Sequence, residues 1–304
     1  MSTFTSPLSA VDVHAAADRI RPYIRRTPLL RTEVDGRSVV LKLEHLQRSG
    51  SFKVRGALNG MLSGSPADHV VAASGGNHGL GVATAAALLG VASTIYVPET
   101  VPEAKARRIE AAGARLIRHG ANFAQAADAA ADFAAPPAYR SLHAYNDPIV
   151  VAGQGTLAAE VVANAPDVDT VVVAAGGGGL AAGTALAIGG RRTVVVEPRY
   201  CCGVHDALAA GKPVDSPTDS VASSALGATR MGDVPFGVLS TGNVHSVLVS
   251  DEQILSARDR LWEEFRIAAE PAAAAPFAAW LAGDVPGELP CLVICGANTD
   301  WVAN

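Results

Sequence analysis

Lys53 is the first residue of this sequence whose surroundings suggest covalent chemistry. It stands between a strand expected at 39–43 and a helix expected at about 52–62, among small and apolar neighbours. Burial there would remove water from the ammonium group, which lowers a lysine pKa and frees the amine to attack a carbonyl carbon. A lone lysine at a helix start more often belongs to a solvated helix face, so this hypothesis needs support from other motifs.

A run of four glycines supplies that support. Residues 176–179 follow an apolar strand expected at 169–175 and precede a helix that begins at Leu180. Glycine tolerates positive φ, so backbone N–H groups can converge on an anion at the positive end of the helix. The turn therefore predicts a phosphate site, with a packing turn as the alternative. It matches neither the nucleoside-triphosphate loop nor the regular dinucleotide glycine spacing.

Two more turns carry polar groups. The turn at 74–78 offers backbone and side-chain donors at a helix start, suited to a carboxylate or a phenolate oxygen, although Asn77 could simply cap the helix. Cys295 ends a strand expected at 291–295, and ligands in open α/β sheets collect beyond the carboxyl ends of strands. A buried packing thiol is the alternative for Cys295.

Strands and helices alternate along most of the chain, which predicts an α/β fold built on parallel sheets. The region 198–243 is irregular, and we expect short helices and loops there, covering a site. Two lobes are expected, with the N-terminal segment on the second lobe. The expected strands are 39–43, 70–73, 93–97, 115–117, 169–175, 193–197, 245–249 and 291–295, and the expected helices are 11–24, 52–62, 80–89, 102–112, 122–133, 154–163, 180–188, 251–266 and 271–282.

Composition narrows the function classes. The chain has 304 residues, 49% of them hydrophobic, and a net charge of −5, which gives no basic surface for nucleic acid. No signal peptide and no membrane-spanning segment are expected. Four cysteines without a disulfide or zinc spacing predict a reducing, cytoplasmic environment.

Taken in chain order, these motifs resemble the pyridoxal-phosphate enzymes of fold type II, in the serine/threonine dehydratase branch. Sister branches, the cysteine and threonine synthases, typically place Asp-Arg after the lysine, where this chain has Val54-Arg55. The resemblance runs from about residue 10 to the last residues. The matching segments are 42–44 with 47, 50–57, 74–79, 146–147 with 152–156, 176–180, 196–198, 270–274 and 295–298.

The resemblance implies a two-lobed fold, each lobe a mainly parallel twisted sheet flanked by helices. The large, cofactor-binding domain would comprise residues 1–64 and 146–304, and the small domain residues 65–145. The family also implies a homodimer.

The resemblance further implies the cofactor, pyridoxal 5′-phosphate, and a role for each matching residue. Lys53 would hold the cofactor as a Schiff base and remove the substrate α-proton. Asn77 would bind the 3′-oxygen, Phe52 would lie against the ring, and Cys295 would meet the pyridine nitrogen. The phosphate would bind Gly176, Gly177, Gly178, Gly179 and Leu180; the substrate carboxylate would bind Ser74, Asn77, His78 and Gln154; Glu270 and Gly227 are further site candidates.

The implied reaction is β-elimination of L-threonine and/or L-serine to 2-oxobutanoate or pyruvate plus ammonia. One alternative is a bulkier 3-hydroxy amino acid such as phenylserine or 3-hydroxyaspartate, with Arg199 or Arg230 binding an acidic side chain. Serine racemases of the family carry a serine where this chain has Gly75, so racemisation is disfavoured. A non-catalytic nucleotide-binding protein is the alternative from another class.

Departures from the family pattern affect two further expectations. The family's metal site uses the glutamate matched by Glu197 and an acid about six positions later, where Gly203 stands, so we expect no metal. Ala273 and the segment 223–227 also depart from the family pattern, so the pattern does not identify the substrate side chain that the enzyme prefers. The chain stops soon after Cys295, so no regulatory domain is expected.

Overall fold

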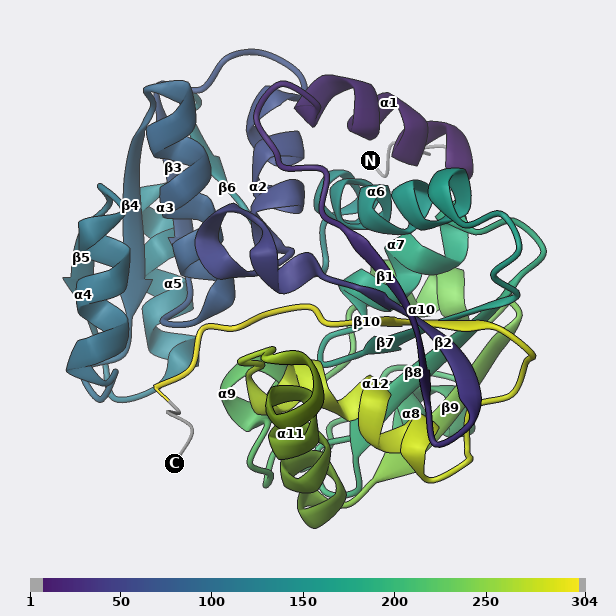
Figure 1. Ribbon diagram of the computed structural model, residues 1–304. Helices are drawn as coiled ribbons and strands as arrows, with labels where there is room; N and C mark the ends of the chain where they lie inside the picture. Colours follow the sequence, from purple (N-terminus) through teal and green to yellow (C-terminus); the bar gives the residue numbers. More distant parts are fainter. Residues whose placement is uncertain (1–7, 301–304) are drawn as a thin grey trace.

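The computed structural model describes residues 8–300, which build two sheets joined by helices (Figure 1). The larger sheet has the strand order β1-β2-β10-β7-β8-β9. Its strands run parallel except for the antiparallel pair β1 and β2. The bounds are β1 (Leu29–Val34), β2 (Arg37–Lys42), β7 (Thr170–Ala174), β8 (Arg192–Pro198), β9 (Val244–Val249) and β10 (Pro290–Val293).

The smaller sheet has four parallel strands in the order β5-β4-β3-β6. These are β3 (His69–Ala73), β4 (Ala92–Val97), β5 (Arg115–Arg118) and β6 (Tyr139–Ser141). Helices α3 (Asn77–Leu89), α4 (Glu103–Ala111) and α5 (Phe123–Phe133) connect them. All four strands fall within the predicted small domain, residues 65–145. The domain division itself stays a prediction, and residues 1–7 and 301–304 lie outside the described residues.

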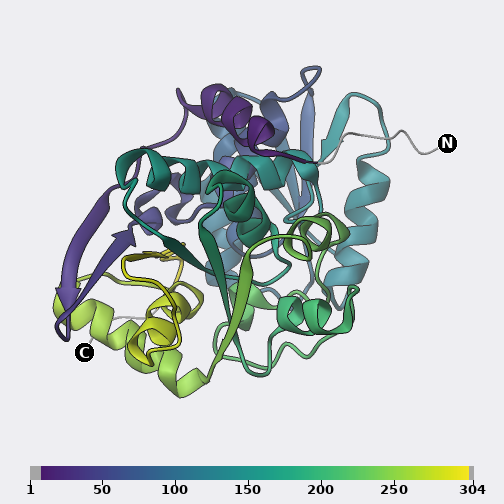
Figure 2. The same ribbon diagram turned by 90° about the vertical axis from the view of Figure 1, so that its right-hand side faces the viewer.

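Helices cover both faces of the larger sheet. Helices α1 (Ala10–Ile20), α6 (Pro148–Asn164) and α7 (Gly179–Ala187) pack together on one face, and α11 (Asp251–Phe265) and α12 (Pro271–Leu281) lie on the other (Figures 1 and 2). Every residue of the central strand β7 is buried. That arrangement explains its uninterrupted apolar sequence, because a parallel strand covered on both faces meets no water.

Small residues let the helices approach closely. A Cβ added at Gly155 on α6 would lie 2.4 Å from the carbonyl oxygen of Gly183 on α7. The abundance of alanine and glycine in the sequence is therefore a packing requirement at this helix crossing, because any larger side chain would push the two helices apart.

Helix α2 (Lys53–Leu62) packs against α3 and α6 and so connects the two parts of the molecule. A buried ionic cluster holds it. The guanidinium of Arg55 donates to Glu44 at 2.5 Å and to Glu160 at 2.8 Å, and Lys42 donates to Glu160 at 2.5 Å. Since three of these side chains have no exposed surface, the pairs must satisfy one another.

The α/β fold class predicted from the sequence is confirmed, while several predicted elements differ. Strand β1 is absent from the predicted strands, and it pairs with β2. The helix expected at 154 begins at Pro148, because Asp147 caps it through Ile149 and Val150. Strand β6 was not predicted, and β10 ends at Val293.

The irregular region 198–243 contains three short helices: α8 (Gly203–Ala210), α9 (Ser223–Leu226) and α10 (Asp233–Leu239). This agrees with the expectation of short helices and loops. Within residues 8–300, no helix has both the length and the apolar character needed to cross a bilayer.

Candidate active site

Lys53 is half-buried at the start of α2. Its Nζ donates to the carbonyl oxygen of Ala144 at 3.2 Å and stands 5.0 Å from the centre of the Phe52 ring. Burial lowers the pKa of Lys53 to about 8, and the nearby Cys295 and Glu270 only partly oppose that shift. A lysine with this pKa has a reactive neutral fraction near pH 7.

The four-glycine turn, residues 176–179, links β7 to α7. None of the backbone N–H groups of residues 176–180 donates a hydrogen bond to another described residue. The turn is also tightly surrounded: a Cβ at Gly176 would lie 2.7 Å from the Leu226 carbonyl oxygen, and one at Gly177 would lie 2.3 Å from the Tyr145 ring. Only glycine therefore fits here, and the free donors at a helix start are suited to binding an anion.

Two consecutive residues connect the Lys53 amine with the four-glycine turn. Ala144 accepts the hydrogen bond from Lys53, and the next residue, Tyr145, packs its ring against Gly177. Residues 143–146 thus bridge the predicted nucleophile and the predicted phosphate site. This juxtaposition is the one that the chemistry of Lys53 requires.

A second turn with free donors lies at the start of α3. The backbone N–H groups of Asn77 and His78 donate no hydrogen bond to other described residues. Helix α9 spans the distance between the two turns: a Cβ at Gly76 would lie 3.4 Å from the Ser224 carbonyl oxygen, while Leu226 contacts Gly176. Both turns with unpaired N–H groups therefore face the same short helix.

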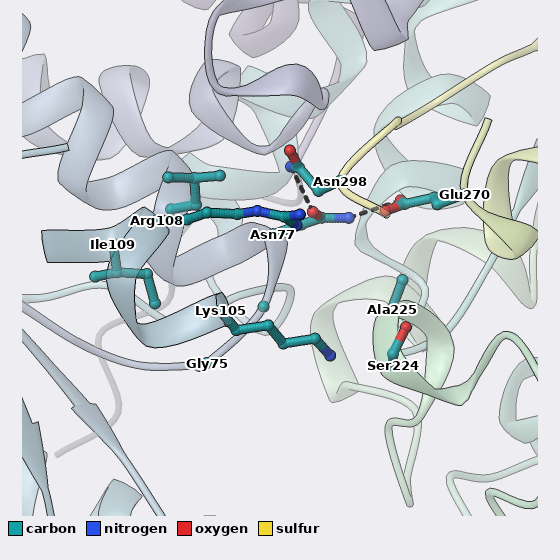
Figure 3. Close-up of a pocket in the computed structure, with 11 residues that line it drawn as sticks. Gly75, Asn77, Lys105, Arg108, Ile109, Ser224, Ala225, Glu270 and Asn298 are labelled. Atoms are coloured by element: carbon teal, nitrogen blue, oxygen red, sulfur yellow. Dashed lines mark hydrogen bonds between the residues drawn. The ribbon is translucent and has the colours of Figure 1, made fainter. Parts of the chain in front are cut away.

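A pocket opens between α3 and α4 on one side and α9 on the other (Figure 3). Asn77 sits between Glu270 and Asn298, and the Lys105 side chain extends toward Ser224 and Ala225 (Figure 3). Lys105 and Arg108 were not predicted as site residues, because charged residues on a surface helix carry no local signal. Asn298 belongs to the matching segment 295–298, for which the resemblance implies a role only for Cys295.

The predicted carboxylate-binding residues take different places. Of the four, only Asn77 lines this pocket. Ser74 accepts a hydrogen bond from the Gly76 N–H at 3.2 Å. Gln154 is fully buried on α6 and accepts from the Gly56 N–H at 3.2 Å, while its Nε2 has no partner among the described residues. Their role with a substrate stays a prediction.

His78 is buried and contacts Leu142, the residue after β6, rather than lining this pocket. Its Nε2 lies 2.9 Å from the carbonyl oxygen of Leu142, which requires a proton on Nε2. Burial, helped by the positive charge of Lys53, lowers the pKa of His78 to about 3. The imidazole is therefore neutral and provides no positive charge for an anion. The donor that His78 can offer at this turn is its backbone N–H.

Cys295 lies beyond the end of β10, close to Lys53. It is 3% exposed, and its carbonyl oxygen accepts from the Phe52 N–H at 3.1 Å. Burial raises the pKa of the thiol, and Glu270 adds to the rise. Cys295 therefore stays a protonated thiol, which is compatible with the predicted contact to a pyridine nitrogen.

Of the remaining predicted site residues, one lines the pocket and the others lie outside its lining. Glu270 is 5% exposed and lines the pocket, whereas Gly227 closes α9 through its N–H bond to Ser223 at 2.8 Å. Neither Arg199 nor Arg230, the two arginines expected to meet an acidic substrate, lines this pocket. The positively charged residues that line this pocket are Lys105 and Arg108.

Glu197 has a structural role of its own. Its two carboxylate oxygens accept hydrogen bonds from the N–H groups of Val204 at 2.9 Å and His205 at 2.8 Å. The carboxylate therefore caps helix α8, which begins at Gly203. Within residues 8–300, no group of three or more His, Cys, Asp or Glu side chains is arranged to hold a metal ion.

These residues fit pyridoxal phosphate. The cofactor has an aldehyde, a phosphate and a pyridine ring with a phenolic oxygen. The site offers a desolvated amine at Lys53, unpaired N–H donors at 176–180, a neutral thiol at Cys295 and an amide at Asn77. Each chemical group of the cofactor thus has a partner of suitable type.

Comparison with known proteins agrees with that fit. Residues 20–296 match the sequence profile of the family described as "Pyridoxal-phosphate dependent enzyme". The chain is similar to an L-threonine ammonia-lyase of Geobacter sulfurreducens, with 37% identity over 95% of this chain and 75% of that protein. It is also similar to a catabolic L-threonine dehydratase of Staphylococcus aureus, with 33% identity over 96% and 90% of the two chains.

Solved structures give the same result. A threonine deaminase from T.th. superposes with a TM-score of 0.90 and 34% identity, covering 97% of this chain and all of the other (100%). A maize serine racemase superposes with a TM-score of 0.92 and 28% identity, covering 97% and 95%. The profile match, the sequence relatives and the site geometry agree: the chain belongs to the family of pyridoxal-phosphate dependent enzymes.

Proposed function

We propose that this enzyme is an ammonia-lyase that eliminates water from L-threonine and/or L-serine, giving 2-oxobutanoate or pyruvate plus ammonia. The observation that carries the proposal is the position of Lys53. Its amine is half-buried and hydrogen-bonded to Ala144, next to the residue that packs against the four-glycine turn. The names of the sequence relatives support the same reaction class.

Bound pyridoxal phosphate supplies an electron sink for the pair of electrons left when the substrate α-proton departs. Lys53 would hold the cofactor through Nζ until the substrate amine displaces it, and the freed amine, whose pKa burial lowers, would then take that proton. Residues 176–180 would bind the phosphate through backbone N–H groups. Asn77 would donate to the 3′-oxygen, Phe52 would support the ring, and Cys295 would face the ring nitrogen.

The substrate carboxylate would bind at the start of α3. The free N–H groups of Asn77 and His78 point the positive end of that helix at an anion. The side chains of Ser74 and Gln154 complete the predicted set. Gly75 leaves no acid or base at its position, which supports elimination over racemisation.

A keto-acid assay with a panel of L- and D-3-hydroxy amino acids tests the proposal. We expect product from L-threonine and/or L-serine and none from the D-enantiomers. Lys53→Ala should lose both keto-acid formation and the visible absorbance of the bound cofactor, and Lys53→Arg should not restore them, because a guanidinium does not form an imine. A Lys53→Ala protein that keeps both properties would refute the proposal.

A second candidate substrate is a 3-hydroxy amino acid with an acidic side chain, such as 3-hydroxyaspartate. Its supporting observation is Lys105, whose side chain points into the pocket and forms no hydrogen bond or ion pair with a described residue (Figure 3). Lys105→Met should then raise KM for 3-hydroxyaspartate about 10-fold or more while leaving KM for L-threonine unchanged. Equal effects on both substrates would exclude a selective role for Lys105.

We also propose a cytoplasmic homodimer. The free thiols Cys201, Cys202, Cys291 and Cys295 support a reducing compartment. The dimer rests on the family resemblance, and light scattering of the purified enzyme measures it directly. A mass of 31.0 kDa in solution would contradict it, since that is the mass of one chain.

A further inference from the structure

The side-chain amide of Asn77 is held from both sides. Its Nδ2 donates to Glu270 Oε1 at 2.7 Å, and its Oδ1 accepts from Asn298 Nδ2 at 2.7 Å (Figure 3). Asn77 starts α3, whereas its two partners lie near the C-terminus, on the other side of the pocket. The three side chains form a chain of hydrogen bonds across the pocket.

With Glu270 ionised, the donors and acceptors allow only one orientation of this amide. Both hydrogens of Asn298 Nδ2 are in use, one to Asn77 and one to the carbonyl oxygen of Ser49 at 2.8 Å. An ionised Glu270 can only accept. Turning the Asn77 amide over would set its oxygen against the Glu270 carboxylate and its nitrogen against the nitrogen of Asn298, with both hydrogen bonds lost.

The two partners are held by a common backbone segment. The Glu270 N–H donates to the Gly296 carbonyl oxygen at 3.2 Å, two residues before Asn298. A Cβ at Gly296 would lie 2.3 Å from Glu270 Oε1, so glycine is required for this approach. Contacts that do not involve Asn77 thus hold Glu270 against the segment that carries Asn298.

The orientation leaves one hydrogen of Asn77 Nδ2 unused. No described residue accepts from it, and Asn77 lines the pocket. We propose that Glu270 and Asn298 are positioning residues that lock the Asn77 amide so that this remaining N–H donates to the 3′-oxygen of the cofactor. The inference rests on the proposed function, in which Asn77 meets that oxygen.

The absorbance of the bound cofactor reports this hydrogen bond directly. Tautomers with the proton on the imine nitrogen and on the 3′-oxygen absorb in different bands, and a donor aimed at the 3′-oxygen favours the proton on nitrogen. Burial raises the pKa of Glu270 to about 7, while Asn77, Lys105 and Lys53 oppose that shift. Spectra should therefore be recorded above pH 8, where the carboxylate is ionised.

The test compares Glu270→Ala and Asn298→Ala with Asn77→Ala. We expect each to shift the absorbance toward the 3′-oxygen tautomer and to weaken cofactor binding about fivefold or more. Adding Glu270→Ala to Asn77→Ala should cause no further spectral shift, because the amide that Glu270 positions is already absent. Glu270→Gln keeps a carbonyl oxygen for the Asn77 Nδ2 and should stay closer to the wild-type spectrum than Glu270→Ala.

Glu197→Ala is the matched control, since Glu197 is also a buried glutamate that accepts N–H bonds but caps α8. It should lower stability without changing the band ratio. A wild-type band ratio in both Glu270→Ala and Asn298→Ala overturns the inference, and so does a wild-type ratio in Asn77→Ala. Loss of the cofactor bands in Lys53→Ala stands apart from these results and tests the proposed function alone.

Discussion

The ammonium nitrogen of Lys53 lies 3.2 Å from the carbonyl oxygen of Ala144. This hydrogen bond ties the first residue of α2 to the segment that leads from β6 of the smaller sheet into α6 of the larger part. The next residue, Tyr145, packs against Gly177. Residues 144 and 145 thus connect the Lys53 amine to the predicted phosphate site.

Replacing Lys53 should stabilise the cofactor-free protein. The pKa of Lys53 falls from 10.5 to about 8 on folding. The unfolded chain therefore binds the proton more tightly, so this site costs stability below about pH 8, and the cost disappears as the pH rises to 10.5. Lys53→Met should raise stability at pH 7 by up to about 3 kcal/mol, with a smaller gain near pH 10.

Calorimetric melting of the cofactor-free proteins at both pH values measures this effect. Lys212→Met is the control, because Lys212 is exposed and its replacement should change little at either pH. A Lys53→Met protein that melts below wild type at pH 7 would show that the amine is not destabilised by burial.

Gly176→Ala should damage the predicted phosphate site. The added methyl group would lie 2.7 Å from the Leu226 carbonyl oxygen and 2.9 Å from its Cα, and backbone atoms cannot rotate away. We expect a loss of about 1–3 kcal/mol in stability together with weaker binding of pyridoxal phosphate, measured by denaturant unfolding and by fluorescence titration. Gly190→Ala is the control, because nothing lies within 4 Å of that added Cβ; equal effects would argue against a tight turn.

Arg55→Met should be strongly destabilising. Arg55 has no exposed surface, and its loss leaves the buried carboxylate of Glu44 without its ion-pair partner. Breaking a buried pair in this way costs about 3–5 kcal/mol. Arg107→Met removes the exposed pair with Glu103 and should cost less than about 1 kcal/mol. Urea unfolding of both variants provides the comparison, and a mild effect of Arg55→Met would contradict a buried cluster.

Gly75→Ser should destabilise the protein because Val101 already fills the space beside Gly75. An added Cβ would lie 2.5 Å from Val101 Cγ2. We expect a loss of about 1–3 kcal/mol, and Val101→Ala in the same chain should recover part of it. Thermal melting of the single and double variants is the measurement. Additive losses in the double variant would show that the two side chains do not compete for space.

The sequence determined the chemistry-bearing segments and the fold class. Alternating apolar strands and helices reflect local periodicity, and glycine turns at helix starts reflect local backbone requirements, so both can be read within a window of about ten residues. Lys53, the four-glycine turn and the turn before Asn77 were found in this way. Strand β6 forms by pairing with β3, and α6 starts at Pro148 because Asp147 caps it. Local sequence patterns describe both causes poorly.

Only the tertiary structure decided which side chains face one another across the pocket. Asn77 meets Glu270 and Asn298 over sequence separations of 193 and 221 residues. Lys105 enters the pocket because α4 packs beside α3 in the smaller sheet's layer, whereas Arg199 and Arg230, the arginines chosen from the sequence, do not. Such contacts arise from the packing of whole elements, and the hydrophobic pattern of each element fixes which face it buries but not which distant polar residue it meets.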